Sequence, residues 1–357
     1  MRPDGKDGAG ENAAANAPIA ASLPSEQALA LAGQHLQSGR LAEAETTCRR
    51  ILQARPDYAP ALHLLGIILY RAGNLRGAME LVRQAIMADA TVALYHCNLG
   101  EMARLSGQRD LALAAGRRAL EIDPKLAHAL NNVGIVHFER GEFDEAIAHY
   151  RRAIAQAPDF AEAHSNLGNA LRAKKKYAEA LSAYQDALRL RPTFGDALNN
   201  LGTTLRDMGR RDQAETVYRR ALSLNPSDPS VLNNLALALK ENEQLDEANS
   251  LLTRSLLVDP NNPKTLTYLA LVKLEQKQVA DAEIAAQRAL ALAGEDSDAL
   301  NAMGLVRFEQ QNSEAALALF RRAIGLKPDL ADAHVNIGNI LKKTASLPPR
   351  VKRMNAR

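Results

Sequence analysis

The sequence has no tryptophan, only two cysteines and few aromatic residues of any kind, which make up 4% of its 357 residues. Two cysteines cannot build a disulfide framework, and they suit a reducing compartment. Strands favour aromatic and β-branched residues, so this shortage, together with 65 alanines, argues against a β-sandwich. Alanine is the best helix former, and its small side chain lets helices approach closely. The composition therefore predicts an all-α protein with closely packed helices.

The sequence also lacks a long apolar run and an excess of positive charge in its body. No uninterrupted apolar stretch reaches the roughly 18 residues of a membrane-spanning helix. The formal net charge is +3, but residues 342–357 hold six lysines and arginines and no acid, and without them residues 1–341 stand at −3. Nucleic-acid-binding surfaces need clustered positive charge. We therefore expect no membrane span and no nucleic acid bound by the folded body.

Residues 1–24 show no apolar periodicity and are rich in alanine, glycine, asparagine and proline. A secretory signal needs a basic start and then a continuous apolar stretch of about 7–15 residues. Asp4, Asp7 and Glu11 interrupt such a stretch here. We interpret residues 1–24 as a disordered leader that is not cleaved, and we expect a cytoplasmic protein.

From Ser25 onward the sequence repeats itself every 34 residues, with no insertion or deletion up to residue 343. When positions are counted from Ser25, position 8 is glycine or alanine, position 20 is alanine in every full repeat, and aromatic residues recur at position 24. The prolines at residues 56, 124, 158, 192, 226, 260 and 328 keep the same period. Repeats start at residues 25, 59, 93, 127, 161, 195, 229, 263 and 297, and a half repeat starts at 331.

These marks resemble the tetratricopeptide repeat (TPR) family, and the resemblance covers residues 25–343. It implies an α-solenoid, a right-handed superhelix of about nine and a half helix-turn-helix repeats. The residues agree with this fold: in the fourth repeat, apolar residues recur at helical spacing on both sides of Gly141, which marks a turn. Pro158 then ends the second helix because proline lacks the amide donor. One repeat cannot bury its own apolar face, so its neighbours complete the core.

Position 6 of the first helix is asparagine in five consecutive repeats. Positions 5 and 6 are expected on the concave face, where solenoids usually bind their partners. An asparagine amide donates and accepts, so a row of them can pair with the main chain of an extended peptide. The alternative is that these side chains are solvated or cap neighbouring helices. The candidate peptide-binding residues are Asn98, Asn132, Asn166, Asn200 and Asn234 at position 6, with Asn131, Asn199 and Asn233 at position 5.

An asparagine row in a long uninterrupted array resembles the superhelical region of O-linked N-acetylglucosamine transferases. The resemblance implies that the position-6 asparagines bind the peptide backbone of protein substrates. Tyr268 and Ala302 interrupt the row before it recurs at Asn336. The glycosyltransferase catalytic region of that family is expected after the repeats and does not occur in this sequence.

No motif for catalysis or for metal binding accompanies the repeats. The sequence has no phosphate-binding loop, no G-x-S-x-G and no G-x-G-x-x-G. Three of the histidines, His96, His164 and His334, share a helix-packing position, and no histidine pair has a ligand spacing. Cys48 falls in an apolar position and Cys97 at position 5, neither with a base partner. We expect no enzyme, no metal and no cofactor.

Two charged features remain open. The carboxylates at position 13 either bias the groove toward basic ligands or form a solvated helix face; they are Glu139, Asp207, Glu241, Glu275 and Glu309. The basic tail, residues 344–357, contains Pro348 and Pro349, which exclude a helix there. The helix expected over 331–343 is shaped to receive a second helix that does not follow, which leaves a face for self-association.

The sequence therefore favours a non-catalytic scaffold that binds extended peptide segments of partner proteins in an asparagine-lined concave groove. Two alternatives stay open. The chain could be the substrate-recognition part of a TPR-containing protein glycosyltransferase whose catalytic region is absent here, or it could be a scaffold that assembles with copies of itself.

Overall fold

The computed structural model describes residues 23–345, and this part of the chain consists of nineteen α-helices and no strand. The all-α prediction is confirmed. The expected leader and basic tail lie almost entirely outside the described residues. The helices are α1 (Ser25–Gln37), α2 (Leu41–Ala54), α3 (Ala59–Arg71), α4 (Leu75–Ala88), α5 (Ala93–Leu105), α6 (Arg109–Ile122), α7 (Ala127–Glu139), α8 (Phe143–Gln156), α9 (Ala161–Ala173), α10 (Tyr177–Leu190), α11 (Gly195–Asp207), α12 (Arg211–Leu224), α13 (Pro229–Glu241), α14 (Leu245–Val258), α15 (Pro263–Glu275), α16 (Val279–Ala293), α17 (Ser297–Glu309), α18 (Ser313–Leu326) and α19 (Ala331–Ala345).

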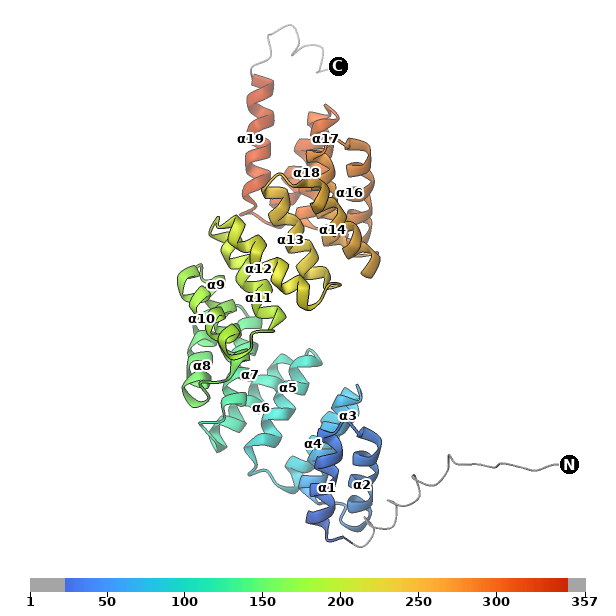
Figure 1. Ribbon diagram of the computed structural model, residues 1–357, viewed down its shortest axis with the longest axis vertical. Helices are drawn as coiled ribbons and strands as arrows, with labels where there is room; N and C mark the ends of the chain where they lie inside the picture. The colour runs from blue at the N-terminus through green and yellow to red at the C-terminus, as the bar shows by residue number, and fades with distance from the viewer. Residues whose placement is uncertain (1–22, 346–357) are drawn as a thin grey trace, which may run out of the picture. The chain divides into compact units, whose positions relative to one another are not determined.

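The odd-numbered helices are the first helices of the repeats, and each begins at the residue where a repeat was predicted to start. The even-numbered helices are the second helices. The last helix, α19, runs to Ala345, two residues beyond the predicted half repeat. In the ribbon view the chain passes through successive helix hairpins in order (Figure 1). The prediction of an α-solenoid built from helix-turn-helix repeats is confirmed.

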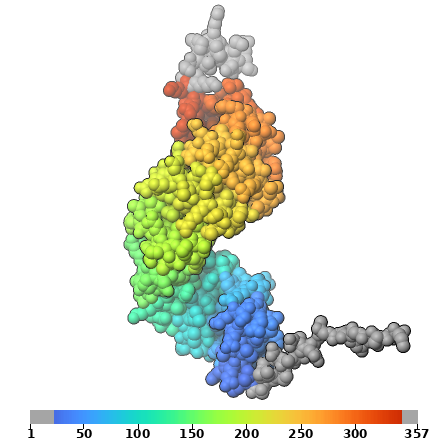
Figure 2. All heavy atoms as spheres, viewed as in Figure 1, coloured from blue at the N-terminus to red at the C-terminus, as the bar shows by residue number. Residues whose placement is uncertain are grey.

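The chain divides into two compact units, residues 1–176 and 177–357, and the boundary falls in the turn between α9 and α10. Within each unit every helix packs on the next one along the chain. The space-filling view accordingly shows successive colours following one another without a gap inside each unit (Figure 2). First helices also contact the first helix of the following repeat, as α5 does with α7 and α15 with α17. No two successive second helices of the described residues make a comparable contact, so the first helices form the tighter side of each unit.

Each turn between a first and a second helix has one residue in the left-handed region, always at repeat position 15. After that residue the amide N–H of Glu142 donates to the carbonyl of His137 at 2.9 Å, and every repeat has the equivalent bond. This is the arrangement that ends many helices, and glycine adopts it without a steric cost. Glycine occupies position 15 at residues 39, 73, 107, 141 and 209, with φ between 74° and 83°. The remaining four turns use Lys175, Glu243, Lys277 and Gln311, with φ between 58° and 63°.

The small residue at position 8 is explained by the large residue at position 24. A Cβ added to these glycines would lie 2.5–2.7 Å from a ring atom in three pairs, Gly134–Tyr150, Gly202–Tyr218 and Gly304–Phe320. The three rings are fully buried, as are the position-20 alanines beside them. The sequence marks of the repeat therefore describe one joint, in which the first helix lies directly on the ring of the second.

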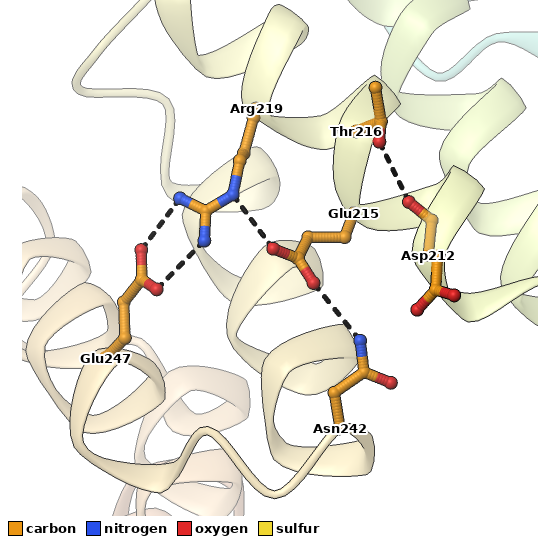
Figure 3. A network of polar contacts seen from close by, with 6 residues as sticks. All are labelled: Asp212, Glu215, Thr216, Arg219, Asn242 and Glu247. Atoms are coloured by element: carbon orange, nitrogen blue, oxygen red, sulfur yellow. Dashed lines mark hydrogen bonds and ion pairs between the residues drawn. The ribbon is translucent and has the colours of Figure 1, made fainter.

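A polar network on the second helices of the sixth and seventh repeats is drawn in Figure 3. Arg219 of α12 donates from both terminal nitrogens to Glu247 of α14, at 2.8 and 2.9 Å, and from Nε to Glu215 at 3.0 Å. Asn242, in the turn before α14, donates to the other oxygen of Glu215 at 3.1 Å. The guanidinium of Arg219 lowers the pKa of Glu247 below its usual value. The network connects α12 to the second helix and the turn of the next repeat.

Candidate functional site

The position-6 asparagines lie on the first helices, the side on which successive repeats approach one another. All are half-buried, so they belong neither to the core nor to the freely solvated surface. Asn98, Asn132 and Asn166 lie on α5, α7 and α9 of the first unit, and Asn200, Asn234 and Asn336 lie on α11, α13 and α19 of the second. In the predicted interruption, Ala302 is fully buried on α17.

A hydrogen bond with one constant spacing holds these asparagines. The Nδ2 of the position-6 residue meets the position-5 side chain of the preceding repeat, 35 residues earlier. The donor–acceptor distances are 2.8 Å for Asn98 and His63 Nε2, 3.7 Å for Asn132 and Cys97 Sγ, 3.0 Å for Asn166 and Asn131 Oδ1, 2.9 Å for Asn234 and Asn199 Oδ1, and 3.1 Å for Asn336 and Asn301 Oδ1. For Asn200, the corresponding position-5 residue is in the other unit.

Each bond fixes one end of an amide and leaves the rest of it open. One N–H of the Nδ2 group is used, while the second N–H and the Oδ1 remain. Within residues 23–345 we find no other hydrogen bond to the side chains of these five asparagines. The side chains are therefore oriented by the protein and still able to pair with a donor and an acceptor outside it.

The position-5 asparagines lie behind this row. Asn131 and Asn233 are each only 5% exposed, and Asn199 is half-buried. Asn131 and Asn199 accept from the position-6 residue of the next repeat. Asn233 cannot, because the next repeat has Tyr268 at position 6, and it donates instead to Thr265 Oγ1 at 2.8 Å. The structure thus brings the two predicted columns together as pairs, with position 5 underneath.

Sequence reasoning missed one member of the position-5 column, His63, and placed Cys97 in the column without assigning it a partner. They differ chemically from asparagine, so the column was visible only as a shared repeat position. Burial lowers the pKa of His63 to about 4, so at neutral pH its ring is uncharged and Nε2 can accept from Asn98. Burial raises the pKa of Cys97 to about 12, so the thiol stays protonated. The pKa of Cys48 is raised in the same way to about 12.

The position-13 carboxylates are largely occupied by neighbouring cations. Arg104 Nη1 lies 3.0 Å from Glu139, and Lys240 Nζ lies 2.6 Å from Glu275, both again at a spacing of 35 residues. Arg211 lies 3.5 Å from Glu241. These three carboxylates serve contacts between repeats, which is the role of a structural helix face. Glu309 is exposed and has no ion-pair partner among the described residues.

The histidines at position 4 have a structural role. His96, His164 and His334 each lie within 3.1 Å of the backbone carbonyl six residues earlier, at the end of the preceding repeat. His96 and His164 are 8% exposed. In the described part of the chain, no three histidine, cysteine or acidic residues are grouped so that they could hold a metal ion. None of the nineteen described helices has the length and apolar character needed to cross a membrane.

Comparison with known families follows the repeats. Residues 160–356 match the profile described as the Cilia and flagella-associated protein 70 C-terminal domain. Residues 134–172 match a TPR repeat profile, and residues 35–98 match a tetratricopeptide repeat profile. Among curated proteins, the UDP-N-acetylglucosamine--peptide N-acetylglucosaminyltransferase of Caenorhabditis elegans is 35% identical over 78 residues. That match covers 22% of this chain and 7% of the relative.

Solved structures show the same fold at low sequence identity. A tetratricopeptide repeat protein from Parabacteroides merdae has a TM-score of 0.58 and 15% identity, over 70% of this chain and 98% of its own. The Cut9-Hcn1 hetero-tetramer of the APC/C has a TM-score of 0.55 and 15% identity, over 89% and 90%. The Pseudomonas aeruginosa pilF structure has a TM-score of 0.52 and 24% identity, over 58% and 94%. The chain therefore belongs to the tetratricopeptide repeat family and, over residues 160–356, to the group described as the Cilia and flagella-associated protein 70 C-terminal domain.

Proposed function

We propose that the chain is a non-catalytic cytoplasmic scaffold that holds extended peptide segments of partner proteins along its row of position-6 asparagines. Tetratricopeptide arrays are protein-interaction modules, and a row of equivalent amides suits a ligand with a repeating backbone. The observation that carries the proposal is the repeated hydrogen bond that each amide donates to the preceding repeat. It orients each amide and leaves an N–H and an oxygen for the ligand.

The spacing of the row fits an extended chain. Packed helices lie about 8–10 Å apart, and an extended peptide advances about 3.3 Å per residue. One asparagine would therefore meet the peptide about every third residue. Because each contact is made to main-chain groups, the row would tolerate many peptide sequences.

In this proposal the position-5 residues are supports and do not touch the ligand. Asn131 and Asn199 fix the amides of Asn166 and Asn234, and Asn233 contacts the first helix of the following repeat through Thr265. A side chain that is pre-oriented loses less conformational entropy on binding, so the support increases affinity without a new contact.

Replacing Asn132, Asn166 and Asn200 by alanine tests the proposal. A 15-residue peptide is selected on the wild-type protein from a random-sequence phage library, labelled with fluorescein, and measured by fluorescence anisotropy. With one net hydrogen bond of about 0.5–1.5 kcal/mol from each asparagine, the triple variant should bind roughly 10- to 2000-fold more weakly. The matched control replaces three side-chain amides of the second helices, Gln84, Gln185 and Gln287, and should bind like the wild type. Equal affinities of both variants would refute the groove assignment.

The 78-residue similarity to the Caenorhabditis elegans transferase favours a second candidate. We infer that the same row would then recognise protein substrates for a glycosyltransferase. The test is to sequence the source transcript beyond the codon for Arg357. A glycosyltransferase region in the same reading frame would support this role, and a stop codon without such a region would remove it. The peptide-binding experiment is indifferent to this outcome, because both candidates use the same asparagines.

A further inference from the structure

The asparagine row is interrupted in the eighth and ninth repeats, and the first-helix surface differs there. Position 6 is Tyr268 and Ala302 in these two repeats, and position 9 is leucine in both of them and in the preceding repeat. These leucines are Leu237, Leu271 and Leu305, and all three are half-buried. The interruption thus removes two amides at position 6, and aliphatic side chains lie beside it at position 9.

Two of these leucines line a hollow of about 430 Å³ that lies wholly within the second unit. Leu271 and Leu274 come from α15, Leu305 from α17 and Val335 from α19. Val335 is 60% exposed. Pockets that hold small ligands start at about 300 Å³ and combine apolar walls with a few polar groups. The hollow therefore has room for one or two side chains of a bound segment.

Polar groups border the hollow in two ways. Asn336 and its support Asn301 are part of its lining, so one amide of the asparagine row opens onto it. Glu309 and Asp332 are also part of the lining, are exposed, and have no ion-pair partner in the part of the chain that the structure describes. The other acid, Glu275, is neutralised by Lys240. The two free carboxylates outnumber the remaining cation of the lining, Lys277.

We propose that this hollow is a side-chain pocket that gives the scaffold sequence preference: it takes an aliphatic residue of the partner segment, adjacent to a lysine or arginine that pairs with Glu309 and Asp332. The inference rests on the proposed function, since the segment is the one that the asparagine row holds. The asparagine row binds the main chain of the segment and therefore discriminates little between peptide sequences. Over the two repeats that lack the asparagine, the pocket binds one side chain of the segment instead. Beyond these repeats, Asn336 again binds the main chain of the segment.

The test uses four labelled 15-residue peptides built on the sequence selected on the wild type. Each peptide carries Leu-Arg, Ser-Arg, Leu-Ser or Ser-Ser at one pair of adjacent positions. The pair is moved along the peptide one residue at a time, and the affinity of each peptide is measured by fluorescence anisotropy. At the register that meets the pocket, replacing leucine by serine should weaken binding to the wild type about tenfold. Replacing arginine by serine should weaken it about threefold, and less at high salt.

Two variants test whether the preference for leucine over serine comes from the pocket. Leu305→Asn should lose the preference for leucine and keep the wild-type affinity for the Ser-Ser peptide. The control, Leu237→Asn, changes the same repeat position on α13 outside the lining, and it should keep the preference. Circular dichroism melting confirms that both fold. Val335→Asp changes an already exposed side chain and should also lose the preference, which covers the case in which Leu305→Asn does not fold.

The outcomes separate this proposal from the proposed function. An unchanged leucine preference in Leu305→Asn and Val335→Asp overturns the pocket while leaving the asparagine row intact. If Asn166→Ala binds the Ser-Ser peptide as tightly as the wild type, the row fails instead. If deletion of residues 346–357 raises the affinity for the Leu-Arg peptide tenfold, the chain's own basic tail occupies the pocket and the partner segment is overturned as its occupant. A dimer in sedimentation that Val335→Asp dissociates would overturn it in favour of a second copy.

Discussion

The two units have the same repeat but build its turn differently. In the first unit, glycine occupies the left-handed position of four turns, at residues 39, 73, 107 and 141, and only Lys175 departs from it. In the second unit only Gly209 does so, and Glu243, Lys277 and Gln311 adopt the same φ with a side chain present. The turn is therefore imposed by the packing of the two helices it joins, and glycine only removes its cost. The second unit carries local strain that the first has largely avoided.

The units also differ in what supports the asparagine row. In the first unit the acceptors are His63, Cys97 and Asn131, three different chemical groups. In the second unit they are Asn199 and Asn301. Seven of the eight histidines precede residue 177. The same site geometry is thus reached in the second unit with amides alone, and in the first with an amide, a thiol and one titratable imidazole, His63.

The largest expected effect concerns the joint that both units share. Gly134→Ala in the first unit and Gly202→Ala in the second each place a methyl group within 2.7 Å of a buried tyrosine ring. The ring must move in a packed core, so each change should destabilise by about 1–3 kcal/mol. The readout is the urea midpoint of unfolding.

Gly338→Ala is the matched control for this prediction. It changes the same repeat position on α19, where an added Cβ meets nothing within 4 Å. Alanine is the better helix former, so this variant should be neutral or slightly more stable. Equal midpoints for all three variants would show that the glycine–ring joint does not limit the stability of either unit.

The turns give the next effect, with opposite signs in the two units. A non-glycine residue in the left-handed region destabilises the folded state by about 1–2 kcal/mol. Glycine removes this strain, but it also increases the entropy of the unfolded chain, which offsets part of the gain. Glu243→Gly and Lys277→Gly should therefore each stabilise by about 0.5–1 kcal/mol. Gly73→Ala and Gly107→Ala, where no atom lies within 4 Å of the new Cβ, should each destabilise by about 1 kcal/mol. If Glu243→Gly or Lys277→Gly lowered the urea midpoint in the same experiment, the second unit would not be strained at its turns.

The fold was accessible from the sequence because its repeat has no insertion. Glycine at position 15 marks five of the nine turns, proline and alanine columns mark the helix ends and joints, and the predicted starts coincide with the first residues of ten helices. The division into two units at α9 and α10 was not accessible, because the fifth repeat has the same length and the same marks as the others.

The candidate site was only partly accessible. The asparagine columns at positions 5 and 6 can be read from the sequence, but their pairing depends on how far one first helix slides along the next. That offset is one residue beyond the period, so Asn166 meets Asn131 at a spacing of 35, which a search for 34-residue identity does not reveal. For the same reason the sequence did not reveal that His63 supports Asn98 or that Cys97 supports Asn132.

The histidines predict a pH effect that should separate the units. Burial lowers the pKa of His63 to about 4, and burial with His137, Arg152 and Arg117 nearby lowers that of His149 to about 4. The unfolded chain then binds these protons more readily than the folded one, so stability is complete above about pH 6.5 and falls as the pH drops from 6.5 toward 4. The first unit should lose hydrogen-exchange protection in this window before the second, after correction for intrinsic rates. His63→Asn with His149→Gln should remove the difference, since the amide oxygen introduced by the first substitution would still accept from Asn98; loss of protection by both units together would contradict the assignment.

The smallest effect concerns the ion pairs of the second unit. Glu247→Gln removes the charge that Arg219 binds with two nitrogens, but both side chains are more than 40% exposed. Exposed pairs contribute about 0.2–1 kcal/mol and are screened by salt, so the loss in unfolding free energy should be near the lower end and vanish at high ionic strength. In the first unit, Glu139→Gln breaks the ion pair with Arg104. The side chains of Glu139 and Arg104 are 27% and 21% exposed. Its loss should be larger and less salt-dependent, and the reverse order in urea unfolding at low and high salt would show that bidentate geometry outweighs burial in these repeats.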